Sequence, residues 1–88
     1  MKPIVYPAIF HKAEEGGYWV EFPDLPCVTE GDDLIEAFNM AGDCLLVTIA
    51  DEDPEKLPEP TPLENIKVKD GDYVLLVKPC YFDINASE

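Results

Sequence analysis

Apolar and polar residues near the start of the chain follow the pattern of two β-strands joined by a turn. Residues 4–12 (IVYPAIFHK) and residues 18–22 (YWVEF) are rich in the β-branched and aromatic residues that strands favour. Between them lies AEEGG, where Gly16 and Gly17 are free to adopt positive φ. The pattern predicts a β-hairpin. Because Pro7 has no N–H to donate, we expect the first strand to lie at a sheet edge or to be broken locally at Pro7.

Alternation along these strands assigns their side chains to two faces. The first strand has Tyr6, Ala8 and Phe10 on one face and Val5, Ile9 and His11 on the other; the second has Tyr18, Val20 and Phe22 on one face and Trp19 and Glu21 on the other. The next residues, PDLP (23–26), cannot extend the second strand, because both prolines fix φ and lack an N–H. The chain is therefore predicted to turn there.

A short third strand and a helix are predicted next. CVTEG (residues 27–31) has strand composition and ends at a glycine. Asp33 can then cap a helix, with Glu36 three residues later completing an aspartate version of the capping box. From Leu34 the apolar residues recur at the spacing of three and four that is typical of an amphipathic helix. We expect this helix to run to about Ala50.

The rest of the chain predicts a solvated connector and a last strand. Residues 51–65 hold six acids and four prolines, which end the helix and favour an extended excursion from the domain. A turn at Asp70-Gly71 then leads to YVLLV (73–77), a run typical of a strand with both faces covered. The predicted order is β-β-β-α-β, an α+β fold with one helix on one face of a small sheet. A chain of 88 residues is expected to form a single domain over residues 1–88.

Net charge narrows the choice of partner. The formal charge is −13, from nineteen acidic residues against six lysines and no arginine. Nucleic-acid affinity depends largely on Lys and Arg contacts with phosphates, so we expect no direct binding to nucleic acid. A basic protein suits this charge better. No apolar run approaches the length of a membrane span, so no membrane partner is expected.

Cysteine usage predicts a reducing compartment. Cys27, Cys44 and Cys80 are odd in number and no two have the C-x-x-C spacing. The N-terminus has no signal segment. The sequence therefore predicts a cytoplasmic protein with three free thiols that act as small core hydrophobes.

Catalysis finds little support in these residues. A metal-dependent nuclease needs carboxylates that converge from separate elements, and the first strand has none between Ile4 and Lys12. His11, the only histidine, belongs to no assignable triad. Phosphate-binding glycine motifs are also missing. We therefore expect neither enzymatic activity nor a cofactor or metal.

Four blocks of the sequence resemble one family when taken in order. YPAIF, GGYWVEFPDLP, TEGDDLIEAFNMAGDCL and LPEPTPLE are similar to the blocks of the HicB-like antitoxins, the partners of HicA toxins, over about residues 4–80. The resemblance implies a reduced ribonuclease-H-like fold. Two departures are noted: Cys27 directly follows Pro26 where the family usually has a glycine between them, and the C-terminal DNA-binding module of many members is not expected within these 88 residues.

The resemblance also implies a function. HicA toxins are small basic ribonucleases that cleave mRNA with a histidine, and an acidic domain can neutralise one by covering its RNA-binding surface. Our candidates for the contact surface come from expected exposure and not from a family motif. Three are apolar anchors and four form a charged rim: Trp19, Leu25 and Val28, then Asp24, Glu30, Asp32 and Asp33.

Two alternatives stay open from the sequence. The chain could be a solitary HicB-like protein that forms homo-oligomers with a structural or regulatory role, or a residual nuclease. Self-association, as a dimer or higher homo-oligomer, is expected under either main interpretation, because YVLLV and the following CYF carry more apolar surface than one helix covers.

Overall fold

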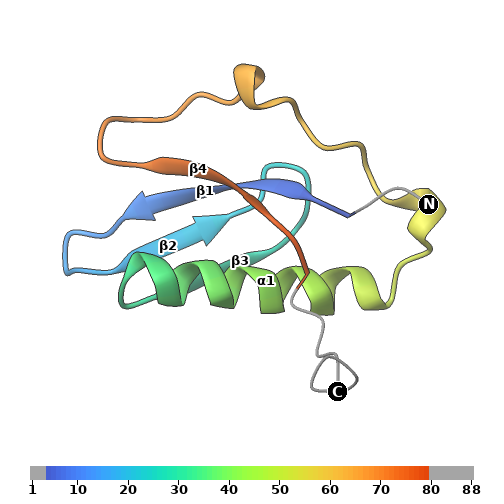
Figure 1. Ribbon diagram of the computed structural model, residues 1–88, viewed down its shortest axis with the longest axis horizontal. Coiled ribbons are helices and arrows are strands. Elements are labelled where there is room, and N and C mark those ends of the chain that lie inside the picture. Colours follow the sequence, from blue (N-terminus) through green and yellow to red (C-terminus); the bar gives the residue numbers. More distant parts are fainter. Residues whose placement is uncertain (1–3, 80–88) are drawn as a thin grey trace, which may run out of the picture.

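The fold is a four-stranded antiparallel sheet with one long helix packed against it (Figure 1). The computed structural model describes residues 4–79. Its elements are β1 (Tyr6–Lys12), β2 (Tyr18–Glu21), β3 (Val28–Gly31), α1 (Leu34–Ala50), two 3₁₀ turns (Pro54–Lys56 and Leu63–Asn65) and β4 (Tyr73–Val77). The predicted order and the α+β class are confirmed, while the likeness to ribonuclease H stays a prediction.

The strands lie in the order β3-β2-β1-β4. The hairpin of β1 and β2 forms as predicted, β3 pairs with the free side of β2, and β4 returns to pair with the free side of β1. Within residues 4–79, no helix is long and apolar enough to cross a membrane. The last strand thus closes the sheet beside the first, across more than sixty residues of sequence.

The core lies between α1 and one face of the sheet. Phe10, Val20 and Leu45 have no exposed surface, and together they join both layers. The other members of this core are Tyr6, Ala8, Phe22, Cys27, Ala37, Ala41, Ile49 and Val77. Full burial of one such large side chain contributes about 1.5–3 kcal/mol. The predicted apolar faces of the hairpin and of the helix are therefore the faces that meet.

The start of α1 is capped almost as the sequence predicts. The carboxylate of Asp33 accepts a hydrogen bond from the backbone N–H of Glu36, at 2.8 Å. In return, the Glu36 carboxylate accepts from the N–H of Asp32, at 2.7 Å, one residue before the position of a standard capping box. The helix ends at Ala50 as expected.

Two glycines allow the hairpin turn, β3 and the helix start to touch through their backbones. A Cβ on Gly31 would lie 2.4 Å from the backbone nitrogen of Ala37. A Cβ on Gly17, where φ is +80°, would lie 2.6 Å from the carbonyl oxygen of Gly31. No side chain fits at either contact, so the packing there requires glycine.

Of the two arrangements expected for Pro7, an edge strand or a local break, the edge strand is wrong, because β1 is paired on both sides. Lys12 donates its N–H to the carboxylate of Asp72, which precedes β4, so alternation points the nitrogen of Pro7 towards β2. The ladder between β1 and β2 covers only Ile9 to Lys12 on the β1 side. Pro7 therefore sits beyond the end of that ladder, where no N–H is needed.

The expectation that YVLLV is covered on both faces is also wrong. β4 is an edge strand. Val77 is fully buried against the core, whereas Leu76 is 52% exposed on the opposite face. A continuous apolar run thus stands at an edge of the sheet with one of its faces open.

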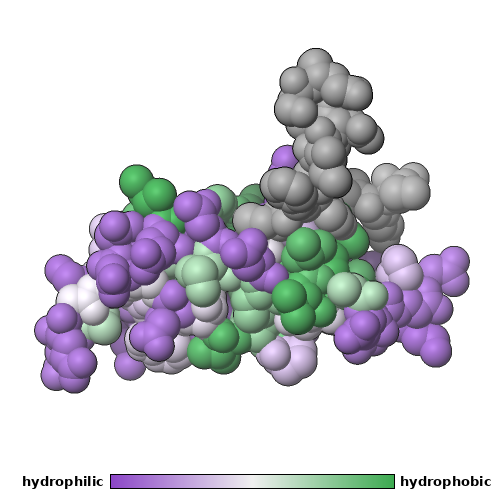
Figure 2. Space-filling model, turned by 90° about the horizontal axis from the view of Figure 1, so that it is seen from below, coloured by the Kyte–Doolittle hydropathy of each residue, from purple (hydrophilic) through white to green (hydrophobic). Residues whose placement is uncertain are grey.

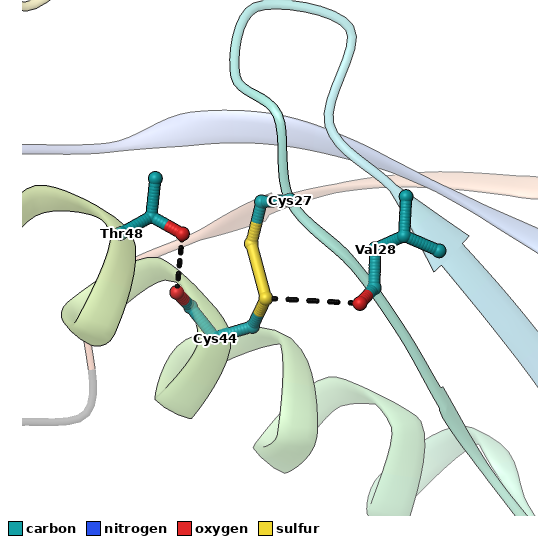
Figure 3. Close-up of a disulfide and its surroundings, with 4 residues drawn as sticks. All are labelled: Cys27, Val28, Cys44 and Thr48. Carbon is teal, nitrogen blue, oxygen red and sulfur yellow. Dashed lines mark hydrogen bonds between the residues drawn. A yellow bond between two sulfur atoms is a disulfide. The ribbon is translucent and has the colours of Figure 1, made fainter.

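Cys27 and Cys44 are joined by a disulfide, so the expectation of three free thiols is wrong for this pair (Figure 3). Their Cα atoms lie 6.4 Å apart. Cys27 follows the PDLP turn and Cys44 lies on α1, so packing of the helix against the sheet brings together two residues whose spacing does not suggest it. Their role as core hydrophobes holds, since Cys27 is 2% exposed. Cys80 lies outside the described residues.

The prediction from this packing concerns Gly31. Replacement by alanine forces the backbone of β3 away from the start of α1, and overpacking of this kind costs about 2–3 kcal/mol. Gly16→Ala is the control: Gly16 has φ of +100° but open space around it, so alanine there costs about 1 kcal/mol. The free energy of unfolding in urea should fall more for Gly31→Ala. An equal or smaller loss than for Gly16→Ala would contradict the close contact.

Candidate functional site

The sheet face opposite α1 carries two rows of side chains aligned by the strand register. The first, here called the polar row, runs from Glu30 on β3 through Trp19 on β2 to His11 on β1. Asp72, just before β4, continues it by binding His11. The second row consists of Val28, Glu21, Ile9 and Val74. We call this surface, on which Leu76 also lies, the open face.

His11 is held by two carboxylates at the centre of the polar row. Its Nδ1 lies 2.9 Å from a carboxylate oxygen of Asp72, and its Nε2 lies 2.5 Å from one of Glu21. Each ring nitrogen of His11 thus has a carboxylate partner within the chain. Within the described residues, no group of three His, Cys, Asp or Glu side chains is placed to hold a metal ion.

Trp19 packs on the ring of His11. The two ring centroids are 4.0 Å apart and the planes differ by 20°, which is a stacked arrangement. Trp19 is still 42% exposed. The indole is therefore held on one side by a fixed ring and open to solvent elsewhere, as interface aromatics often are.

Asp72 also fastens the start of β4 to β1. Its second oxygen accepts the backbone N–H of Lys12 at 3.0 Å. This backbone hydrogen bond is the main cause that lowers the pKa of Asp72 below its ordinary value of 3.8, and the hydrogen bond and charge of His11 lower it further. The folded chain thus favours the ionised carboxylate.

Three of the seven predicted contact residues lie on the open face. Trp19 and Glu30 are cross-strand partners, and Val28 is 66% exposed beside them. The register therefore brings together two predicted anchors and one predicted rim carboxylate.

Asp24 and Leu25 are engaged within the chain instead. The carboxylate of Asp24 accepts the N–H of Thr61 at 2.8 Å and its hydroxyl at 2.5 Å, which ties the Pro-rich connector to the PDLP turn. Leu25 is partly buried against the core. Nearby, the Tyr6 hydroxyl donates to the carbonyl of Pro58. Burial raises the pKa of Tyr6, and the carboxylates of Asp24 and Glu59 raise it further.

Asp32 and Asp33 stand apart from the open face, at the exposed start of α1. The Asp33 carboxylate is the helix cap, so part of its hydrogen-bonding capacity is used. The structure therefore divides the predicted rim among three places.

The sequence analysis missed the His11, Glu21 and Asp72 cluster. Alternation already placed Trp19 and Glu21 on one face of their strand, and a hairpin register would have set His11 beside them. Asp72 is 61 residues from His11, and nothing local links the two.

The outer side of α1 is a second exposed surface with apolar side chains. Figure 2, which views the molecule from the side of α1, shows apolar patches among hydrophilic ones. Exposed apolar residues of the helix include Ile35 at 76% and Val47 at 71%. Unlike the open face, this surface has no in-register row of aromatic and acidic groups.

Comparison with known proteins gives consistent matches. The model of the HicB-like antitoxins of bacterial toxin–antitoxin systems matches residues 6–81. Antitoxin HicB 1 of Photorhabdus laumondii is 44% identical over 66 residues, which are 72% of this chain and 43% of that protein. Antitoxin HicB of Escherichia coli K12 is 41% identical over 63 residues, which are 68% of this chain and 46% of that protein. The chain thus spans less than half the length of these curated relatives.

A solved structure shares the fold. A chain of a toxin–antitoxin complex from Streptococcus pneumoniae superposes with a TM-score of 0.74, over 84% of this chain and 67% of that chain. Its sequence identity is 24%, so the likeness shows the fold alone.

The prediction from this site concerns Asp72 and pH. A lowered pKa in the folded state means that ionised Asp72 stabilises the fold above its unfolded pKa, and that this stability is lost as pH falls through the folded pKa. Asp72→Asn should therefore lower Tm at about pH 5, and the difference from the parent protein should shrink towards about pH 3. Asp70→Asn, in the adjacent exposed turn, is the control. A Tm difference that is constant over this range would contradict the assigned role of Asp72.

Proposed function

Because this chain belongs to the HicB-like antitoxin family, we propose that it neutralises a HicA-like toxin by covering the toxin's RNA-binding surface. The observation that carries the proposal is the family match over residues 6–81. A covering role requires no reaction centre, and we propose no enzymatic activity or cofactor.

Charge supports a basic partner. The net charge is −13, and residues 30–59 contain ten acidic residues and one lysine. Such a field steers a cationic protein towards the chain and sets its orientation. At physiological ionic strength the field reaches only about 8 Å, so apolar contacts must hold the complex. Carboxylates then occupy the positions that RNA phosphates would take on the toxin.

The open face combines the two requirements. Trp19 and Val28 supply exposed apolar surface, and Glu30 supplies negative charge next to them. We propose this face as the centre of the contact. The other predicted contact residues stay predictions: the anchor Leu25 and the rim carboxylates Asp24, Asp32 and Asp33.

The proposal covers only the part of the family that this chain represents. Its curated relatives are more than twice as long as the matched segment. The single domain over residues 1–88, the absence of direct nucleic-acid binding and the dimer or higher homo-oligomer stay predictions. Exposed apolar residues on β4 and α1, such as Leu76 and Ile35, support self-association.

The test uses a HicA-like toxin, taken from a neighbouring reading frame and purified with its catalytic histidine replaced. Calorimetric titration should show saturable binding at about 50 mM NaCl, weakening on the order of tenfold as salt rises to about 500 mM, because screening removes the charge attraction. The chain should also stop mRNA cleavage by the active toxin at equal molar amounts. No binding at low salt would refute the proposed function.

The cytoplasmic location is part of the proposal, and the cysteine pair tests it. The reducing agents of the cytosol keep most protein thiols reduced. In a cytoplasmic protein they should open the Cys27–Cys44 disulfide, so rapid lysis of cells in denaturant with an alkylating reagent should label both cysteines. Labelling of this pair only after added reductant would place the protein in an oxidising compartment and contradict the location.

A further inference from the structure

The indole of Trp19 is fixed in position by its neighbours on the open face. One side of its indole stacks on His11 at 4.0 Å, and Glu21 and Asp72 clamp the imidazole at both nitrogens. The indole therefore loses little freedom when a partner binds, which lowers the entropic cost of association. We call this exposed, supported indole the Trp19 platform.

The free side of the platform faces an unpaired carboxylate. Register places Trp19 between His11 on β1 and Glu30 on β3. Since His11 covers the side towards β1, the opposite side of the indole faces β3. Glu30 stands there as the direct cross-strand neighbour and is exposed. Among residues 4–79, no other ring stacks on Trp19 and no ion pair is formed by Glu30.

A cation is the group that these two neighbours favour. The face of an indole is its electronegative side and attracts cations, and Glu30 adds a full negative charge beside it. The strand positions of the open face contain no lysine to fill that role internally: they are Pro7, Ile9, His11, Trp19, Glu21, Val28, Glu30, Val74 and Leu76. The cation must then come from another molecule.

We infer that the Trp19 platform binds an arginine side chain of the basic toxin, with the guanidinium stacked on the indole and directed to Glu30. Arginine suits the geometry better than lysine, because its planar guanidinium stacks on an aromatic ring and still donates to a carboxylate. This inference rests on the proposed function, which supplies the basic partner. His11 acts as a positioning residue that fixes the indole and does not contact the partner.

An RNA base could also stack on an exposed indole, but the surroundings disfavour it. Stacking platforms for nucleic acid lie in positively charged grooves. Here the strand neighbours of Trp19 on the open face include Glu21 and Glu30, which repel phosphates. The platform therefore favours a cationic protein over nucleic acid.

Matched charge reversals test the site. Glu30→Lys and Asp43→Lys change the net charge equally, but Asp43 is exposed on α1, away from the open face. The titrant is the toxin with its catalytic histidine replaced. Glu30→Lys and Trp19→Ala should each weaken its binding by about tenfold or more. Asp43→Lys should have a much smaller effect. Circular dichroism and Tm of each variant show that the fold is kept.

The positioning role of His11 requires a measurement that a change in protein stability alone would not alter. Trp19 is the only tryptophan of the chain, so its fluorescence anisotropy decay reports on this one ring. His11→Ala should increase local indole motion and weaken toxin binding, whereas His11→Phe, which keeps a flat ring beside the indole, should restore much of both. Unchanged indole motion in His11→Ala would remove the positioning role.

The possible results distinguish failure of the platform inference from failure of the proposed function. If the parent chain fails to bind the toxin, the proposed function fails. If it binds, and Glu30→Lys and Asp43→Lys weaken binding equally, only overall charge matters and the platform inference is wrong. Loss of a dimer in Trp19→Ala, seen by light scattering with toxin affinity unchanged, would instead assign the open face to a second copy and also overturn the inference.

Discussion

Close backbone packing at Gly17, Gly31 and Ala37 fixes how the strands align, and the surface chemistry depends on that alignment. Gly31 lies between the hairpin turn and the first turn of α1, with no room for a Cβ on either glycine. A slip of one residue between β2 and β3 would move every side chain of the shifted strand to the other face. If β2 were the strand that shifted, Val20 would leave the core and Trp19 would be buried under α1. The contact among three small residues therefore selects the register that exposes the indole.

In this register the two faces of the sheet have different roles: one forms the core and the other presents the exposed row of side chains. The covered face buries Phe10, Val20 and Val77 against α1 and supplies the apolar burial that holds the layers together. The open face aligns Glu30, Trp19, His11 and Asp72 across the sheet. Asp72 links both, because the same carboxylate fastens β4 to β1 and holds the ring on which Trp19 rests. Stability of the edge strand and order of the platform are thus coupled.

Short-range patterns in the sequence correctly predicted the features that depend on neighbouring residues. The Asp33 cap, the helical spacing from Leu34 and the glycine turn are all short-range features, and each formed as expected. Long-range pairing explains the failures. Of the two arrangements that Pro7 indicated, an edge strand or a local break, the edge strand is wrong, because β4 pairs with β1. The missing N–H only requires that the ladder to β2 end before Pro7. YVLLV indicated a fully covered strand, and its place at the sheet edge depends on pairing with a strand more than sixty residues earlier. Nor did any local signal indicate that the oxygens of Asp24 bind Thr61, 37 residues away.

The claim that the open face contacts the toxin is tested most directly by NMR. The isotope-labelled chain is titrated with unlabelled toxin whose catalytic histidine has been replaced. The account predicts that the largest shift changes occur at the indole N–H of Trp19 and at the amides of β2 and β3. Changes confined to the exposed side of α1, around Ile35 and Val47, with the Trp19 indole signal unmoved, would contradict it.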